Sequence, residues 1–255
     1  MIYMNDTFTF SNNSSLGIEG LSFGSHFPEE YFLGKKKEAF IAKLAAGSSC
    51  ALECYKSFVS LCESLPLTSG DRSMCLIVLD GLFSINSNWF LMPTSSTGKY
   101  HGGIMSPENY IGGIYHHCAR LCKFASSVLV RYKEVIDGLD LSLGFNFEPS
   151  SGSEVAPSPF DFSSKLLACC VLHDIGKMNL SQDCVYSVAD HGEVAASFIE
   201  SLGFTCEGSV LYAISNHMYG WKAINCFNHI VASGASVGLV LLLMLCECDF
   251  FSSIY

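Results

Sequence analysis

Leu166-Leu-Ala-Cys-Cys-Val-Leu-His-Asp-Ile-Gly-Lys177 is the stretch around which the rest of this chain is organised. Its small and apolar residues predict a buried element, and the length of the run favours a helix. His173 and Asp174 follow this run, and a buried imidazole beside a buried carboxylate needs a partner for both groups. A metal ion satisfies both together. Gly176 can end the helix, and Lys177 places a cation where a phosphate oxygen can sit.

This stretch resembles the signature of the HD phosphohydrolase superfamily, which is named for its His-Asp pair. The dipeptide is frequent by chance, whereas the context Leu-His-Asp-Ile-Gly-Lys is much more specific. The resemblance implies an all-α fold, an HD-domain helical bundle with an N-terminal helical extension. It also implies further His ligands and a late Asp, which must follow in the order of the family.

The composition is that of a globular protein with a large core for its surface. The chain has 255 residues, of which 49% are hydrophobic and only 15% are charged. This length suits one sizeable domain, or one domain with a small extension. The formal net charge of −10 makes the chain a poor general binder of nucleic acid backbone, although this net charge is compatible with a local basic groove.

The thirteen cysteines lie mainly inside apolar runs, and no two of them have the spacing of a zinc knuckle or a redox motif. We interpret them as buried free thiols in a reducing cytosol. The N-terminus lacks the basic start and apolar core of a secretory signal, so the sequence predicts a cytoplasmic protein.

The N-terminal part has no counterpart that we recognise. Residues 1–30 are polar and predict an irregular arm, and helices are predicted over 36–46, which Gly47 can stop, and over 50–62. The apolar segment 74–83 suits a helix or a strand. The predicted domains are an N-terminal arm and helical extension, 1–89, and an HD domain, 90–255.

The first histidine motif narrows the resemblance. Gly112-Gly-Ile-Tyr-His-His117 is similar to a turn found in HD-type 3′-to-5′ exoribonucleases and in the HD domain of conjugative relaxases. The glycine spacing and the apolar Leu121 select His117 as the ligand, with His116 beside it. Upstream, Pro93-Thr94-Ser95 and His101 match the same pattern more loosely.

The middle of the chain predicts a long helix, a long loop and the central helix. The first runs from His117 to about Val135. Residues 138–160 are rich in Gly, Ser and Pro, and a loop of that length is usually an active-site cover or disordered. Asp161 or Ser163 can cap the central helix that leads to the His-Asp pair.

Two further histidines follow in the family order. His191 opens an amphipathic helix over 190–202, which Gly203 ends, and it resembles the third His motif of the family. A helix over 207–219 ends near His217. The family often has His-His at this point, where this chain has Asn216 and then His217, so one of the two imidazoles is missing.

The last apolar segment, Ile230–Cys246, contains about seventeen residues and nears the lower limit for a membrane span. Small and polar residues dilute it, and it leads directly to Asp249 and Ser252, which fit the late Asp motif of the family. An all-helical core explains the apolarity, so no stable membrane insertion is expected.

The resemblance implies a metal site with one or two divalent ions. Mn, Fe, Mg, Zn or Ni would suit imidazole and carboxylate ligands. The implied metal ligands are His117, His173, Asp174, His191, His217 and Asp249, with Asp174 bridging two metals. The implied catalytic residues are Asp174 and Lys177, and the candidate substrate-binding residues are Lys177, Arg120, His101 and His116. Each histidine alone would more often be structural, and the ordered set is what carries the interpretation.

The predicted function is a metal-dependent phosphohydrolase that cleaves a phosphoester of a nucleotide or nucleic acid by metal-activated water. The partner is then a nucleotide or a single-stranded nucleic acid. The turn at Gly112-Gly113 favours nucleic acid, whereas the acidic charge favours a small nucleotide. Two alternatives stay open: a relaxase-like nucleic-acid-processing module, and a degenerate HD fold that binds a nucleotide or a protein. The sequence does not predict the oligomeric state.

Overall fold

The fold was obtained as a computed structural model, which describes residues 48–94, 108, 112–131, 133–134, 159–177, 190–205, 208–223 and 237–254. The described residues form seven α-helices and one 3-10 helix, and no strand occurs among them. The elements are α3 (Ser48–Ser64), α4 (Ser69–Asn86), η1 (Ser87–Leu91), α5 (Gly113–Arg131), α7 (Pro159–Leu172), α8 (His191–Ser201), α9 (Gly208–Ala223) and α11 (Val237–Ile254). The prediction of an all-α fold is confirmed. The predicted arm 1–30, the helix 36–46 and the loop 138–158 lie outside the described residues.

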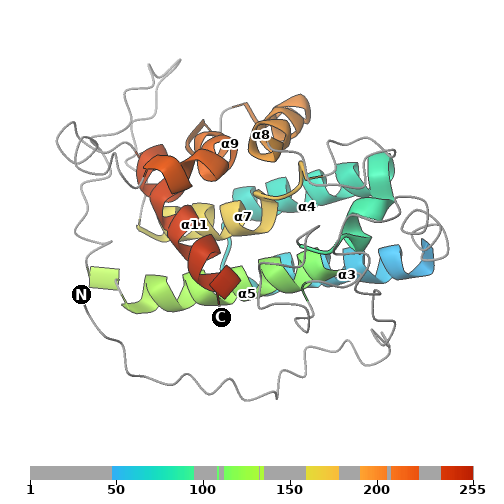
Figure 1. Ribbon diagram of the computed structural model, residues 1–255, viewed down its shortest axis with the longest axis horizontal. Coiled ribbons are helices and arrows are strands. Elements are labelled where there is room, and N and C mark those ends of the chain that lie inside the picture. Colours follow the sequence, from blue (N-terminus) through green and yellow to red (C-terminus); the bar gives the residue numbers. More distant parts are fainter. Residues whose placement is uncertain are drawn as a thin grey trace.

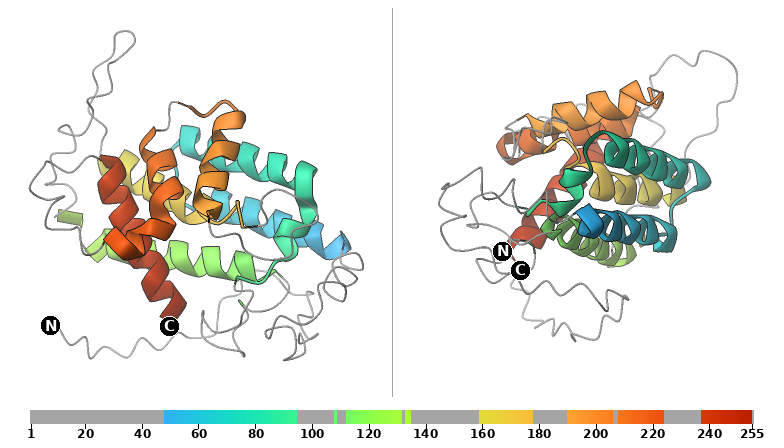
Figure 2. Two further views of the ribbon diagram at one scale, coloured as in Figure 1. Left: turned by 45° about the horizontal axis from the view of Figure 1, so that its top comes forward. Right: turned by 90° about the vertical axis from the view of Figure 1, so that its right-hand side faces the viewer.

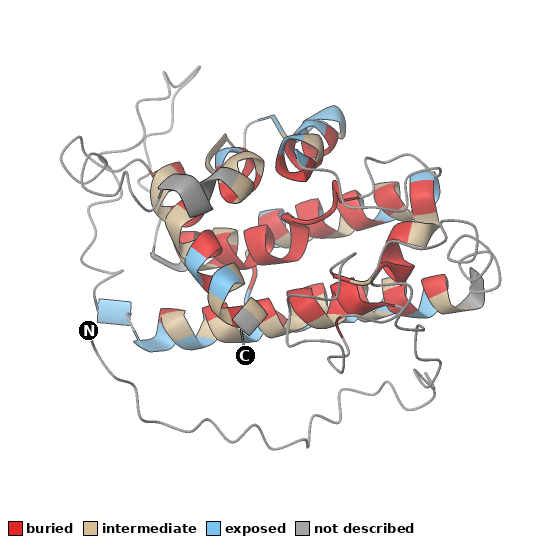
Figure 3. Cartoon of the chain, viewed as in Figure 1, coloured by how far each residue is buried: buried red, intermediate tan, exposed pale blue. Residues whose placement is uncertain are grey.

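Helix α7 occupies the centre of the bundle. It packs against α4, α5, α9 and α11. Figures 1 and 2 show α8 and α9 on one side of α7, with α3 and α5 on the other. Every residue from Leu166 to Lys177 is buried, and Figure 3 shows this stretch as a continuous buried segment. The apolar run was therefore interpreted correctly as a core helix.

The segment 74–83, which suited a helix or a strand, lies within α4. Thr68 caps this helix, because its Oγ1 accepts a hydrogen bond from the backbone N–H of Asp71 at 3.1 Å. The buried carboxylate of Asp71 in turn accepts a hydrogen bond from Ser164 on α7. This polar contact fixes the start of α4 against the central helix.

Helices α3 and α4 share one hydrophobic core with α5 and α7, although they fall in the range predicted as an N-terminal extension. Aromatic rings make the connection. The ring of Phe58 on α3 lies 5.4 Å from that of Trp89 and 5.4 Å from that of Tyr115, measured between centroids. The indole Nε1 of Trp89 donates a hydrogen bond to the carbonyl of Asp174 at 3.2 Å. The aromatic core thus supports the turn that carries the His-Asp pair.

Three predicted helix boundaries are corrected by the structure. Helix α5 begins at Gly113, so His117 lies in its second turn and does not open the helix. The early start has a backbone cause, because the N–H of Ile114 donates to Met92 O at 3.0 Å and Gly112 has a φ of 74°. Helix α9 continues to Ala223, past His217, and α7 begins at Pro159, before both predicted caps. By contrast, α8 begins at His191 and is followed by Gly203 with a φ of 96°, as expected.

One helical segment among the described residues, Ser69–Leu91, is long and apolar enough to cross a membrane. It comprises α4 and η1, half of it is buried within the bundle, and a core helix passes the same test. The apolar segment Ile230–Cys246, which nears the lower length limit for a membrane span, is described only from Val237 onward. There it forms the first half of α11, and this helix packs against α9.

Candidate metal centre

The His-Asp pair lies in a tight turn directly after α7. The helix ends at Leu172, and the N–H of Lys177 donates to Asp174 O at 3.0 Å, which closes the turn. Gly176 was predicted to end the helix, but its role differs. A Cβ on Gly176 would lie 2.1 Å from the carbonyl oxygen of His191. Glycine is therefore required here for the close approach of α8 to the turn.

Replacing Gly176 by Ala is accordingly expected to push α8 away from the turn and to weaken metal binding along with stability. We expect a loss of about 1–3 kcal/mol in the free energy of unfolding, the usual cost of overpacking. Urea unfolding measures it. Gly70→Ala is the matched control, because the nearest atom to a Cβ there is 4.0 Å away. Equal losses in the two variants would contradict this reading of Gly176.

The carboxylate of Asp174 lies between two groups of imidazoles. Its Oδ1 is 3.1 Å from Nε2 of His191 and 3.8 Å from Nε2 of His217. Its Oδ2 is 3.3 Å from Nε2 of His173 and 3.8 Å from Nε2 of His117. Asp174 thus belongs to two clusters of potential metal ligands, which it joins.

The late Asp of the sequence motif lies beside the first cluster. Oδ1 of Asp249 lies 3.1 Å from Nε2 of His117, so α11 brings its carboxylate to the same imidazole that approaches Asp174. The side chain of Asp249 is 14% exposed, whereas the side chains of the other predicted ligands are at most 3% exposed. Of the described ligands, Asp249 is therefore the one nearest to an opening of the site.

Backbone carbonyls set the orientation of two imidazoles. Nδ1 of His173 lies 3.2 Å from Cys170 O, and Nδ1 of His217 lies 2.6 Å from Ile214 O. A carbonyl oxygen only accepts hydrogen bonds, so each Nδ1 carries the hydrogen. In the neutral ring Nε2 then presents a lone pair.

These lone pairs converge on one another and on carboxylate oxygens. Nε2 of His117 and Nε2 of His173 are 3.4 Å apart, and Nε2 of His191 and Nε2 of His217 are 3.2 Å apart. Facing nitrogens at such distances in a buried site share either a proton or a metal ion. The donor set, imidazole nitrogen and carboxylate oxygen, fits a divalent metal. The buried His and Asp side chains can therefore hold a metal ion.

The site keeps its carboxylates ionised. Burial raises the pKa of Asp174, but its interactions with His173 and with the charge of Lys177 outweigh burial and hold that pKa well below its usual value. Burial also raises the pKa of Asp249. The hydrogen bond and the charge of His117 have the larger effect, so the net pKa of Asp249 is below its usual value. Burial lowers the pKa of His117, yet its hydrogen bonds to Asp249 and Glu108 bring that pKa to about 9. The proton that His117 holds is one that a metal displaces.

The ammonium group of Lys177 is buried beside the cluster. Its Nζ lies 2.6 Å from Oδ2 of Asp174 and donates to the carbonyl of Thr94 at 3.1 Å. Burial is favourable only because both partners compensate the charge. The predicted role of Lys177 as a phosphate ligand stays a prediction, and in this arrangement its cation is engaged by Asp174.

Two other predicted substrate-binding residues, Arg120 and His116, are not among the ligands of the two clusters. The guanidinium Nη2 of Arg120 is 2.8 Å from Oε1 of Glu108. His116 is half-buried, its ring lies 5.5 Å from that of Tyr115, and burial lowers its pKa. His101 is outside the described residues. Their roles toward a substrate stay predictions.

The residue that replaces the second histidine points away from the cluster. The side-chain amide of Asn216 donates to the carbonyl of Tyr212 at 2.9 Å, one turn earlier on α9. His217 supplies the imidazole that faces Asp174. The absence of a second histidine at 216 thus leaves the described clusters intact.

Glu108 was not among the site residues predicted from the sequence. Its side chain is 2% exposed and contacts both Arg120 and His117. One signal was present, because Glu108 is the only carboxylate side chain between Asp80 and Glu134. A single acidic residue in a stretch with few charges indicates a specific partner, but only the tertiary structure identifies that partner.

The thiols play no part in the described clusters. All ten described cysteines are free, and the metal-ligand groups found among the described residues contain only His and Asp. Burial raises the pKa of Cys246 and of Cys248 to about 12, so both stay protonated at neutral pH and are poor metal ligands. The predicted reducing, cytoplasmic location stays a prediction.

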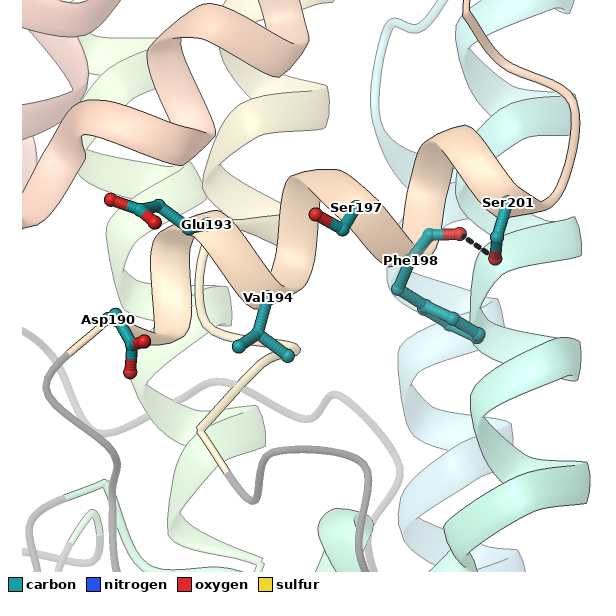
Figure 4. A pocket seen from close by; sticks show the side chains of 6 residues that line it. All are labelled: Asp190, Glu193, Val194, Ser197, Phe198 and Ser201. Atoms are coloured by element: carbon teal, nitrogen blue, oxygen red, sulfur yellow. Dashed lines mark hydrogen bonds between the residues drawn. The ribbon is translucent and has the colours of Figure 1, made fainter.

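A surface depression along α8 contains none of the predicted metal ligands (Figure 4). Its lining residues are Asp190, Glu193, Val194, Ser197, Phe198 and Ser201. The lining includes two carboxylates and no basic side chain, which disfavours a phosphate there. The candidate functional site is therefore the buried His/Asp cluster.

No protein-family model, curated protein or solved structure matches this chain. Its fold and site define an all-α protein with a buried His/Asp cluster that can hold a metal ion.

Proposed function

We propose that this protein is a metal-dependent phosphohydrolase of the HD type, which cleaves a phosphoester of a nucleotide or nucleic acid. One observation carries the proposal. The two oxygens of Asp174 face two separate pairs of imidazoles, and this carboxylate comes from the His-Asp pair that the sequence motif contains. A bridging carboxylate between two nitrogen-rich clusters is suited to a pair of divalent ions.

The residues divide into two half-sites that share Asp174. The first half-site comprises His117, His173, Asp174 and Asp249, and the second comprises Asp174, His191 and His217. Mn, Fe, Mg, Zn or Ni suits nitrogen and oxygen ligands of this kind. When bound, such ions supply an acidified water and neutralise charge on phosphoryl oxygens.

The side chains of the protein perform the positioning. Lys177 holds the carboxylate of Asp174 between the two half-sites, and the indole of Trp89 holds the backbone of the same residue. Because Asp249 is the most exposed of the ligands, we propose that the phosphoester approaches past α11.

The charge of the chain bears on the substrate. A net charge of −10 opposes binding to a long polyanion and favours a small nucleotide or a short single strand. A relaxase-like module that binds nucleic acid without turnover is the alternative. Salt-dependent binding of single strands, with no hydrolysis by the metal-loaded protein, would favour it.

Metal content and phosphodiester hydrolysis test the proposal together. Wild-type protein is expected to hold about one or two divalent ions per chain by elemental analysis and to hydrolyse an aryl phosphodiester with added Mn²⁺. His173→Ala is expected to lose both properties, because it removes a ligand of the first half-site. A wild-type protein without metal, or a His173→Ala variant with unchanged turnover, would show the proposal to be wrong.

A further inference from the structure

We infer that Glu108 is the positioning residue that orients His117 as a metal ligand, with Arg120 balancing the charge of Glu108. The inference rests on the proposed metal site. It adds to that site a carboxylate that is not itself a metal ligand and that acts by orienting the imidazole of His117. Three observations support it: the fixed backbone of Glu108, the two partners of its carboxylate, and the contrast with the other histidines.

The backbone of Glu108 is anchored at the start of α5. Its carbonyl oxygen accepts a hydrogen bond from the N–H of Thr94 at 2.8 Å. The same oxygen would lie 1.9 Å from a Cβ on Gly113, so the glycine permits Glu108 to rest directly against the first turn of the helix. Thr94 also donates through Oγ1 to Gly113 O at 3.0 Å. The position of Glu108 is thus coupled to the helix that carries His117.

Among the described residues, the carboxylate of Glu108 contacts two side chains, one with each oxygen. Oε1 lies 2.8 Å from Nη2 of Arg120, and Oε2 lies 3.6 Å from Nδ1 of His117. Because the side chain is almost fully buried, its charge needs this compensation. Arg120 lies three residues after His117, one turn along α5, so both partners of Glu108 come from one face of one helix.

The two ring nitrogens of His117 therefore face different surroundings. Nδ1 faces Glu108, and Nε2 faces Asp249 and the first half-site. A carboxylate on Nδ1 favours the tautomer in which Nε2 is free to ligate, and it increases the electron density of the ring. In His173 and His217 the corresponding nitrogen faces a backbone carbonyl, which is a weaker acceptor. Of these three histidines, His117 is accordingly the one whose Nδ1 faces a side chain.

Titration calorimetry of the full-length, metal-free protein with Co²⁺ tests the inference. Glu108→Gln is expected to weaken one binding step about 10- to 100-fold, the usual cost of losing an outer-shell partner. The other step, assigned to His191 and His217, is expected to stay unchanged. Glu63→Gln, which removes the same charge from an exposed position on α3, is expected to match wild type.

A spectroscopic signature separates positioning from a general structural effect. In Zn²⁺-loaded protein the Nδ1–H proton of His117 is expected to give a downfield resonance, which Glu108→Gln shifts upfield. Glu108→Asp keeps the charge and is expected to recover part of the Co²⁺ affinity. An Asp variant no better than the Gln variant contradicts the inference.

The outcomes distinguish this inference from the proposed function. If wild type binds Co²⁺ and hydrolyses phosphodiesters while Glu108→Gln binds both ions as tightly, only the inference is overturned. Equal weakening of both steps also overturns it, because a positioning residue of His117 acts on one half-site. If wild type binds Co²⁺, responds to Glu108→Gln as expected and hydrolyses no phosphoester, only the proposed function fails. A wild type that binds no metal overturns both.

Discussion

Asp174→Asn is expected to release metal from both half-sites and to abolish phosphoester hydrolysis. The amide keeps the shape of the side chain, but it carries no charge and replaces one oxygen by a hydrogen-bond donor. Each oxygen of Asp174 faces its own pair of imidazoles, so neither half-site keeps its carboxylate. We expect metal affinity and turnover to fall by more than about 100-fold, beyond the cost of an outer-shell change. Elemental analysis and Mn²⁺-dependent turnover measure the two effects.

Asp80→Asn is the matched control, because Asp80 is an exposed carboxylate on α4 that bonds to Tyr55. It is expected to keep its metal and its activity. If Asp174→Asn retained one ion per chain at full affinity, Asp174 would serve a single half-site. If it retained two, the shared role of this carboxylate would be refuted.

Lys177→Met is expected to destabilise the metal-free protein strongly and the metal-loaded protein only weakly. Without metal, the ammonium group 2.6 Å from Oδ2 is the closest cation to the buried carboxylate of Asp174 among the described residues. Removing one member of a buried ion pair costs about 3–5 kcal/mol, because the remaining charge is left uncompensated. A bound divalent ion supplies the missing charge and also stabilises the native state by mass action. Urea unfolding, in chelator and in excess Mn²⁺, measures the difference.

Lys56→Met provides the comparison for this experiment. Lys56 pairs with Glu53 at 3.0 Å on the exposed face of α3, so its loss is expected to cost at most about 1 kcal/mol in either condition. A loss in Lys177→Met that is the same with chelator and with Mn²⁺ would mean that Lys177 contributes packing and not charge compensation.

The central helix could be predicted from residue types, whereas the set of predicted ligands came from the resemblance. The uncharged apolar run that ends at Leu172 predicts a core helix, because a surface helix needs polar positions. The His-Asp pair at the end of this run predicts a metal site, because a buried imidazole next to a buried carboxylate needs a partner that satisfies both. The expected order of His117, His191, His217 and Asp249 is a resemblance, and the structure brings these side chains together.

Helix boundaries were less predictable for a physical reason. The start of α5 depends on backbone contacts with residues 91 and 92, more than twenty positions earlier, and the Gly-Gly pair does not reveal them. The role of Gly176 was misjudged in the same way. A glycine after an apolar run suits a helix end, but the constraint here is the carbonyl of His191 on another helix.

The sequence alone determined that the apolar run before His173 is a buried helix and that imidazoles and carboxylates are available for a metal, whereas the all-α fold was an expectation from a resemblance. Local residue type and spacing suffice for the buried helix and the available ligands, because these depend on the periodicity of a single helix and on the chemistry of single side chains. Only the tertiary structure decided that Asp174 faces two imidazole pairs, that Lys177 neutralises it and that Glu108 contacts His117. These contacts join residues from separate helices, and helix packing, not spacing along the chain, sets the distances between them.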